Sequence, residues 1–86
     1  MQTEPSEVKQ IIAEIARTLG HSPDAIPSSV DEKAASTVLG VKPSTLANWR
    51  TTGRYRLPFL KMGRLVRYRT SDLAEWIASR RQGGGA

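Results

Sequence analysis

The chain of 86 residues contains no cysteine and only one histidine. Without cysteine it can form no disulfide, no thiolate-ligated zinc or iron–sulfur site and no thiol nucleophile. One histidine and eight carboxylates leave little to ligate a transition metal, so we expect no metal, no cofactor and no catalytic residue. No apolar run reaches the roughly 18 residues of a membrane helix, and the N-terminus lacks the pattern of a signal peptide. We expect one small, soluble, cytoplasmic domain.

Acidic side chains are scarce in the second half of the chain. Residues 1–39 hold three basic and six acidic side chains, whereas residues 40–86 hold ten basic and two acidic ones. Seven basic side chains, with no acid among them in sequence, occupy one stretch: Arg50, Arg54, Arg56, Lys61, Arg64, Arg67 and Arg69. Arginine suits bidentate contacts to phosphate and guanine. The cluster favours a nucleic-acid partner, and the alternative is a solvated basic face.

Apolar residues near the N-terminus recur at the spacing of one helix face: Val8, Ile11, Ile12, Ile15 and Leu19. We therefore predict a helix over 6–19 that ends at Gly20. Its apolar stripe either completes the core or docks a second copy or another protein. Residues 21–29 carry two prolines and no periodicity, which is typical of a linker.

Two further helices are predicted, joined by a short turn. The first has Asp31 or Ser29 as its N-cap and ends at Gly40. The next has Pro43 in its first turn, where proline is favoured, and ends at Gly53. Two helices joined by Gly-Val-Lys have the spacing of a helix-turn-helix.

The remaining residues predict a hairpin and a last helix. Gly63 suits the tight turn of the MGRL segment. Val66 and Tyr68 alternate with arginines, as in a strand with one buried and one basic face. Thr70 or Ser71 is the expected N-cap of a C-terminal helix.

Short motifs occur together in register along this part of the chain: VDEKAA at 30–35, LGV at 39–41, STLANWR at 44–50, PF at 58–59, KMGR at 61–64, VRY at 66–68, and SDL at 71–73 with Trp76. Together they resemble the winged helix-turn-helix domains of the MerR-like fold, a group that includes phage and mobile-element excisionases. Lys42 departs from the pattern, because a Ser or Thr helix cap is frequent there.

The resemblance implies a mainly α fold with a small β-hairpin, a winged helix-turn-helix preceded here by an extra N-terminal amphipathic helix. The expected organisation is an N-terminal helix and linker over 1–29, a DNA-binding domain over 30–81 and a disordered tail over 82–86. The N-terminal helix is not part of the shared pattern.

The resemblance also implies a sequence-specific binder of double-stranded DNA that is not an enzyme. As an excisionase, or recombination directionality factor, it would act at the nucleoid, bind cooperatively as an oligomer or filament, bend DNA and help a tyrosine-recombinase integrase excise a mobile element. A transcription regulator with the same fold is one alternative. A protein-interaction adaptor that acts through the N-terminal helix is another, and an RNA or single-strand binder is a third.

The helix after Pro43 is the expected recognition helix, with Leu46 and Trp49 facing inward by periodicity. Its outward arc then carries four polar residues: Ser44, Thr45, Asn48 and Thr51. The amide of Asn48 can pair with adenine or be a solvated surface group. The hydroxyls and backbone amides of Ser44 and Thr45 can reach phosphate or only cap the helix.

Basic residues are expected to contact DNA around this helix. Arg50 and Arg54 flank its end and suit phosphate contacts. Arg64 at the hairpin tip can reach the minor groove. The other expected contacts lie on the hairpin and its flanks: Arg56, Lys61, Arg67 and Arg69.

The large aromatic residues are Trp49, Trp76, Phe59 and Tyr68. We assign them to the core rather than to a base-stacking platform, because the domain has little else large to bury. On this assignment Trp49→Ala unfolds the domain instead of only weakening binding.

Overall fold

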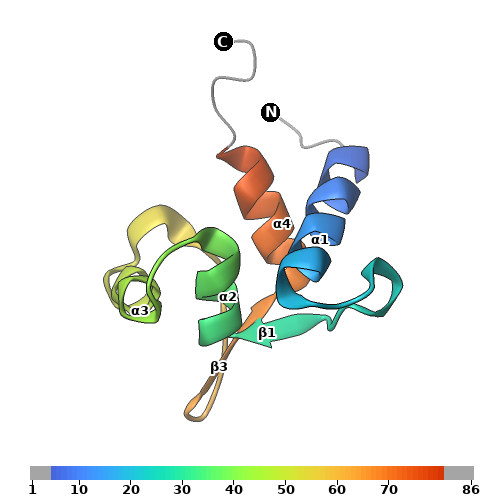
Figure 1. The fold of residues 1–86 in the computed structure, drawn as a ribbon. Coiled ribbons are helices and arrows are strands. Elements are labelled where there is room, and N and C mark those ends of the chain that lie inside the picture. Colours follow the sequence, from blue (N-terminus) through green and yellow to red (C-terminus); the bar gives the residue numbers. More distant parts are fainter. Residues whose placement is uncertain (1–4, 81–86) are drawn as a thin grey trace.

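The structure, a computed structural model, describes residues 5–80; the expected tail over 82–86 lies outside them. Its helices are α1 (Pro5–Leu19), α2 (Glu32–Leu39), α3 (Pro43–Thr52) and α4 (Thr70–Ser79). Its strands are β1 (Ser29–Asp31), β2 (Leu60–Met62) and β3 (Leu65–Arg69), and two short 3-10 turns lie at Pro23–Ala25 and Arg54–Arg56. The fold prediction is confirmed: the chain is a winged helix-turn-helix with an additional N-terminal helix (Figure 1).

The core lies where α1 and α4 pack side by side above the sheet (Figure 1). Ile11 and Ile15 of α1 are buried in the same cluster as Leu46 of α3 and Leu73 of α4. Burying one such side chain contributes about 1.5–3 kcal/mol. The sequence left open whether the N-terminal stripe completes the core or docks a partner. In the structure Ile11 and Ile15 of this stripe complete the core.

The helix-turn-helix begins and turns as the sequence predicts. Asp31 is the N-cap of α2, and its Oδ1 accepts a hydrogen bond from the Ala34 amide at 2.8 Å. Gly40 ends α2 with φ +72°, a left-handed conformation that other residues adopt at a cost of about 1–2 kcal/mol. Lys42 is the N-cap of α3 but makes no side-chain hydrogen bond to its first turn.

The sheet has three strands in the order β1-β3-β2, all antiparallel. The sequence predicts only the β2–β3 hairpin, and the linker prediction over 21–29 is wrong for its last residue, because Ser29 begins β1. Val30 lies opposite Tyr68, and both are buried. A strand of three residues is too short to show its alternation in the sequence, so only pairing with β3 identifies it.

The C-terminal helix starts differently from the prediction. Arg69, not Thr70 or Ser71, is its N-cap, and it makes no side-chain capping bond. The buried Thr70 hydroxyl instead donates to the Pro27 carbonyl at 2.6 Å, and the Thr70 amide donates to Ser28 at 2.8 Å. These bonds fasten the segment before β1 to the start of α4.

The aromatic residues divide between core and surface. Tyr68 is 1% exposed, as predicted, and Trp49 and Trp76 are half-buried with their ring centres 6.2 Å apart. Phe59 is 40% exposed, so the prediction that it belongs to the core is wrong. It precedes β2 and lies 6.4 Å, centre to centre, from the Tyr68 ring.

Candidate nucleic-acid interface

The outward face of α3 carries the polar side chains that the sequence predicts. Ser44, Asn48 and Thr51 are exposed, while Thr45 is half-buried and Leu46 is buried on the opposite face. The Thr51 hydroxyl donates to the Ala47 carbonyl at 2.9 Å, which leaves its oxygen able to accept a further bond. An exposed polar helix face of this kind can enter a DNA major groove.

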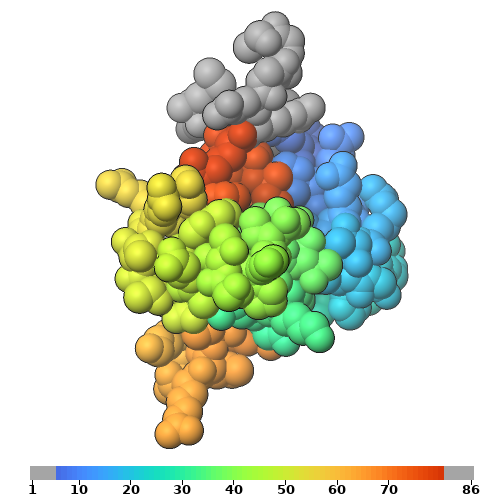
Figure 2. Space-filling model, turned by 60° about the vertical axis from the view of Figure 1, so that its left-hand side comes forward, coloured from blue at the N-terminus to red at the C-terminus, as the bar shows by residue number. Residues whose placement is uncertain are grey.

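The hairpin of β2 and β3 projects from the body beside α3. Figure 2 shows α3 across the front of the molecule and the hairpin as a narrow spur beneath it. Gly63, with φ +62°, is the first of the two turn residues, the position that a type II′ hairpin turn gives to glycine. Lys61, Arg64 and Arg69 are exposed along the spur.

Glu32 of α2 joins α3 to β3. Its carboxylate accepts hydrogen bonds from Arg50 Nε at 3.0 Å, from Arg50 Nη2 at 3.2 Å and from the Tyr68 hydroxyl at 2.8 Å. The Arg50 guanidinium also lies 6.0 Å from the centre of the Phe59 ring. We call Glu32, Arg50 and Tyr68 the hinge triad, because they connect α3 to the hairpin.

Hydrogen bonds and burial shift the pKa of each member of the hinge triad. The bidentate hydrogen bond from Arg50 lowers the pKa of the Glu32 carboxyl from its usual 4.5, although burial opposes the shift. The same bond raises the pKa of Arg50. Burial, aided by the hydrogen bond to Glu32, raises the pKa of Tyr68 to about 12. At neutral pH the triad is therefore an ion pair with a neutral tyrosine.

Two residues of the basic stretch are therefore partly engaged within the protein. Arg50, expected to contact phosphate, forms the ion pair with Glu32. Arg67 donates from Nε to the Ser29 hydroxyl at 3.2 Å and from Nη2 to the Ser29 carbonyl at 2.8 Å, which ties β3 to β1. The sequence shows no acid inside the stretch, but Glu32 reaches it from 18 residues away.

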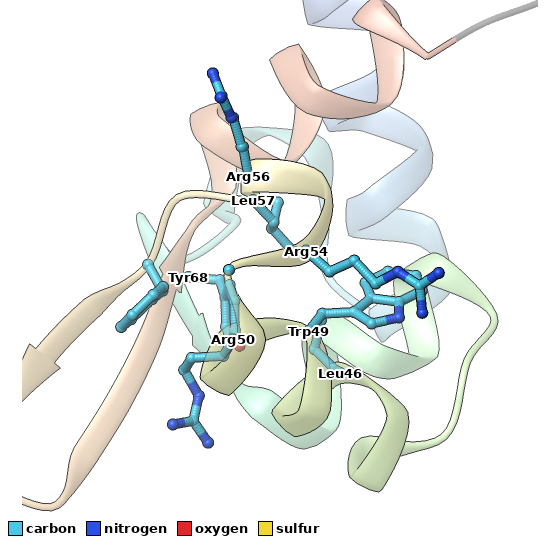
Figure 3. Close-up of a pocket in the computed structure, with 9 residues that line it drawn as sticks. Leu46, Trp49, Arg50, Arg54, Arg56, Leu57 and Tyr68 are labelled. Carbon is cyan, nitrogen blue, oxygen red and sulfur yellow. The ribbon is translucent and has the colours of Figure 1, made fainter.

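A cleft of about 250 Å³ separates α3 from the segment that leads into the hairpin (Figure 3). Its lining is mostly apolar, from Leu46, Trp49, Leu57 and neighbours. In Figure 3 the Arg56 side chain points away from the cleft toward α4, and Arg50 extends on the side of Tyr68. Arg56 is exposed, but it does not project with the hairpin arginines.

The segment after α3 is held in an unusual backbone conformation. Tyr55 and Arg56 have φ +64° and +51°, values that non-glycine residues rarely adopt. The Tyr55 carbonyl accepts hydrogen bonds from the Trp76 indole at 2.8 Å and from Arg80 Nη2 at 2.6 Å. These two bonds, one from α4 and one from the residue that follows it, help to hold the strained turn. Arg54 lies 5.4 Å from the Tyr55 ring centre and is itself exposed.

Sequence reasoning missed Glu32, Tyr55 and Arg80 as residues that position the interface. A signal existed for Glu32, because it lies three residues before the buried Ala35 and so shares the inner face of α2. Tyr55 acts through its carbonyl, and Arg80 reaches it from 25 residues away. No local pattern in the sequence encodes such a bond.

Within residues 5–80 no helix is long and apolar enough to cross a membrane. In the same residues no three histidine or carboxylate side chains gather closely enough to hold a metal ion.

Comparison with known proteins agrees with the geometry. The sequence pattern of a family described as the helix-turn-helix domain matches residues 31–81, which span α2, α3, the hairpin and α4. No curated protein and no solved structure gives a significant match to the chain. Such domains are typically non-enzymatic and bind DNA at specific sequences. More than half of the chain carries this pattern, and the protein belongs to the helix-turn-helix domain family.

Proposed function

We propose that the protein binds a specific DNA duplex as an accessory factor of the excisionase type. The observation that carries the proposal is the placement of an exposed polar helix face beside an exposed basic hairpin on one side of the molecule. In this arrangement α3 occupies the major groove and the hairpin follows the adjacent backbone and minor groove.

Base recognition falls to the outward residues of α3. Asn48 pairs with adenine, and Thr51 contacts a neighbouring base edge through its free lone pairs. Ser44 and Thr45 lie in the first turn of a helix without a side-chain cap, so their amides and hydroxyls suit a phosphate. Asn48 and Thr51 therefore supply the sequence-dependent part of binding, whereas Ser44 and Thr45 fix the position of α3 on the duplex.

Phosphate contacts fall to the exposed cations around α3 and along the hairpin: Arg54, Lys61, Arg64 and Arg69. Arg56 is exposed too, but it points toward α4 and takes no part in these contacts. Arg50 and Arg67 act mainly as positioning residues, because their guanidinium groups are already bound to Glu32 and Ser29. They still add positive charge near the duplex, which steers it toward this face.

The excisionase role rests on the family resemblance of the motifs between residues 30 and 81. In that role neighbouring copies bind adjacent sites as an oligomer or filament, bend the duplex and assist a tyrosine-recombinase integrase in the cytoplasm, at the nucleoid. Bending a site costs on the order of 1–6 kcal/mol, so cooperative contacts between copies would offset it.

The first experiment selects bound duplexes from a random-sequence library and measures affinity for the enriched sequence across a salt series. We expect one enriched motif and a steep salt dependence. The matched pair is Arg64→Gln in the hairpin against Arg17→Gln, an equal charge change on α1 far from α3 (Figure 1). Only the first should reduce the salt slope, by about one. No enriched motif would contradict the proposal.

The second experiment separates excision from transcription control. The protein is added to the recombinase encoded nearest its gene, on a plasmid that carries both attachment sites. Excision that depends on the protein supports the excisionase role. Repression of a reporter without any excision supports the regulator instead.

Deleting residues 1–28 does not test the adaptor alternative by itself, because the deletion removes Ile11 and Ile15 from the core and so destabilises the fold.

A further inference from the structure

The hairpin tip carries exposed apolar side chains. Met62 and Leu65 are the most exposed of the large apolar residues that the structure describes, at 57% and 52%, and Leu60 in the same hairpin is 40% exposed. The partly buried residues packed on the core include Val66 but not these three. Exposing such side chains costs free energy, and apolar surface held out in this way commonly marks a binding site.

The strand register places these side chains on one face. Met62 lies opposite Leu65, immediately beside the two-residue turn, and Leu60 lies opposite Arg67. Residues directly opposite one another share a face of the sheet. The other face carries Val30 and Tyr68, which are buried. The hairpin therefore has a core face at its base, and its outer face carries Arg67 near the base and only apolar side chains, Met62 and Leu65, at the tip.

The surroundings of the tip are basic. Arg64 lies within the turn, Lys61 is next to Met62, and residues 53–69 include no aspartate or glutamate. Charge complementarity therefore favours a polyanion as the surface that meets the tip. A protein groove of acidic character would match the charge too, but the tip projects beside α3 (Figure 2), on the side proposed to face DNA.

We propose that Met62 and Leu65 form an apolar wedge that enters the minor groove and unstacks one base step, so that the hairpin bends the duplex. This inference rests on the proposed DNA binding and adds to it the means of bending. Leucine and methionine are among the side chains that architectural proteins insert between base pairs from the minor groove, which kinks the duplex toward the major groove. Arg64 neutralises the phosphates beside the opened step.

The test uses the duplex enriched from the random library, with 2-aminopurine placed at each purine in turn. The wild-type protein should raise the fluorescence at one step beside the α3 contact, because the probe brightens when it loses its stacking neighbour. Met62→Ala with Leu65→Ala should lose this rise and the accompanying bend measured by energy transfer between the duplex ends. Both residues are exposed, so the double variant should melt like the wild type.

Two further variants sharpen the test. Leu60→Ala removes a similar apolar side chain from the same face but further from the tip, and it should leave both signals unchanged. Met62→Leu, which keeps an apolar wedge, should restore most of the fluorescence rise.

A mismatch at the affected step lowers the cost of unstacking. Wild-type affinity should then rise by about tenfold or more, while the double alanine variant gains little.

Specific binding without a fluorescence rise at any step would overturn the wedge and leave the proposed DNA binding intact. Failure to enrich any duplex would overturn both. Self-association of the wild type in sedimentation that the double alanine variant abolishes, with unchanged bending, would assign the tip to a second copy and also overturn the wedge.

Discussion

Replacing Glu32 by glutamine tests whether the hinge triad holds α3 to the hairpin. The glutamine keeps the size of the side chain but loses its charge, and its single carbonyl oxygen can accept only part of the three hydrogen bonds that Glu32 receives from Arg50 and Tyr68. A hydrogen bond to a charged group contributes about 1.5–3 kcal/mol. The Glu32 and Arg50 side chains are 24% and 21% exposed, so water screens part of that energy.

We expect Glu32→Gln to lower the free energy of unfolding by about 2 kcal/mol, because the Arg50 guanidinium and the Tyr68 hydroxyl lose the charged acceptor and share one neutral oxygen. For a chain of this size the melting temperature should fall by about 8–16 °C. The free energy of unfolding is measured by urea unfolding, followed by the fluorescence of the two tryptophans. The control is Glu75→Gln on the exposed face of α4, which should stay within about 0.5 kcal/mol of wild type.

The pH dependence provides a second measurement of the same bond. The pKa of Glu32 is lower in the folded protein than its usual 4.5, so its stabilisation is fully present above that value and is lost as pH falls through the folded pKa. The wild type should therefore approach the glutamine variant in stability on acidification. Equal stability of the two proteins at neutral pH, or a difference that stays constant into the acid range, would show that the hydrogen bonds to Glu32 do not stabilise the fold.

Three other substitutions separate recognition from stability. Asn48→Ala should cost about 1–3 kcal/mol of binding to the enriched duplex, with the salt slope unchanged, because it removes a base contact and no charge; an equal loss on every duplex would count against base recognition. Asp31→Ala should lower the free energy of unfolding by about 1 kcal/mol through loss of the α2 N-cap, and a neutral result in urea would show that the cap is not needed. Trp49→Ala should cost about 3 kcal/mol of stability, since its ring packs 4.7 Å from that of Tyr55 and also contacts Trp76; a variant of wild-type melting temperature that no longer binds DNA would contradict the core assignment.

The sequence alone determined the elements whose signals are local. The sequence narrows the N-cap of α2 to Asp31 or Ser29 and identifies Gly40 and Gly53 as left-handed helix ends and Gly63 in the hairpin turn. Each of these signals depends on a few neighbouring residues. Such conformations have only a few compatible residue types, so the pattern identifies them. The helical periodicity of α1 likewise predicted a buried face without showing what would cover it.

Only the tertiary structure decided which charged and aromatic groups are available to a ligand. The sequence presents Arg50 and Arg64 alike, yet one is bound to a carboxylate from another helix and the other is exposed at a hairpin tip. Likewise Phe59 and Tyr68 both suit a core, but only Tyr68 faces it. Availability depends on contacts between residues far apart in sequence, and those contacts exist only once the helices and the sheet have packed.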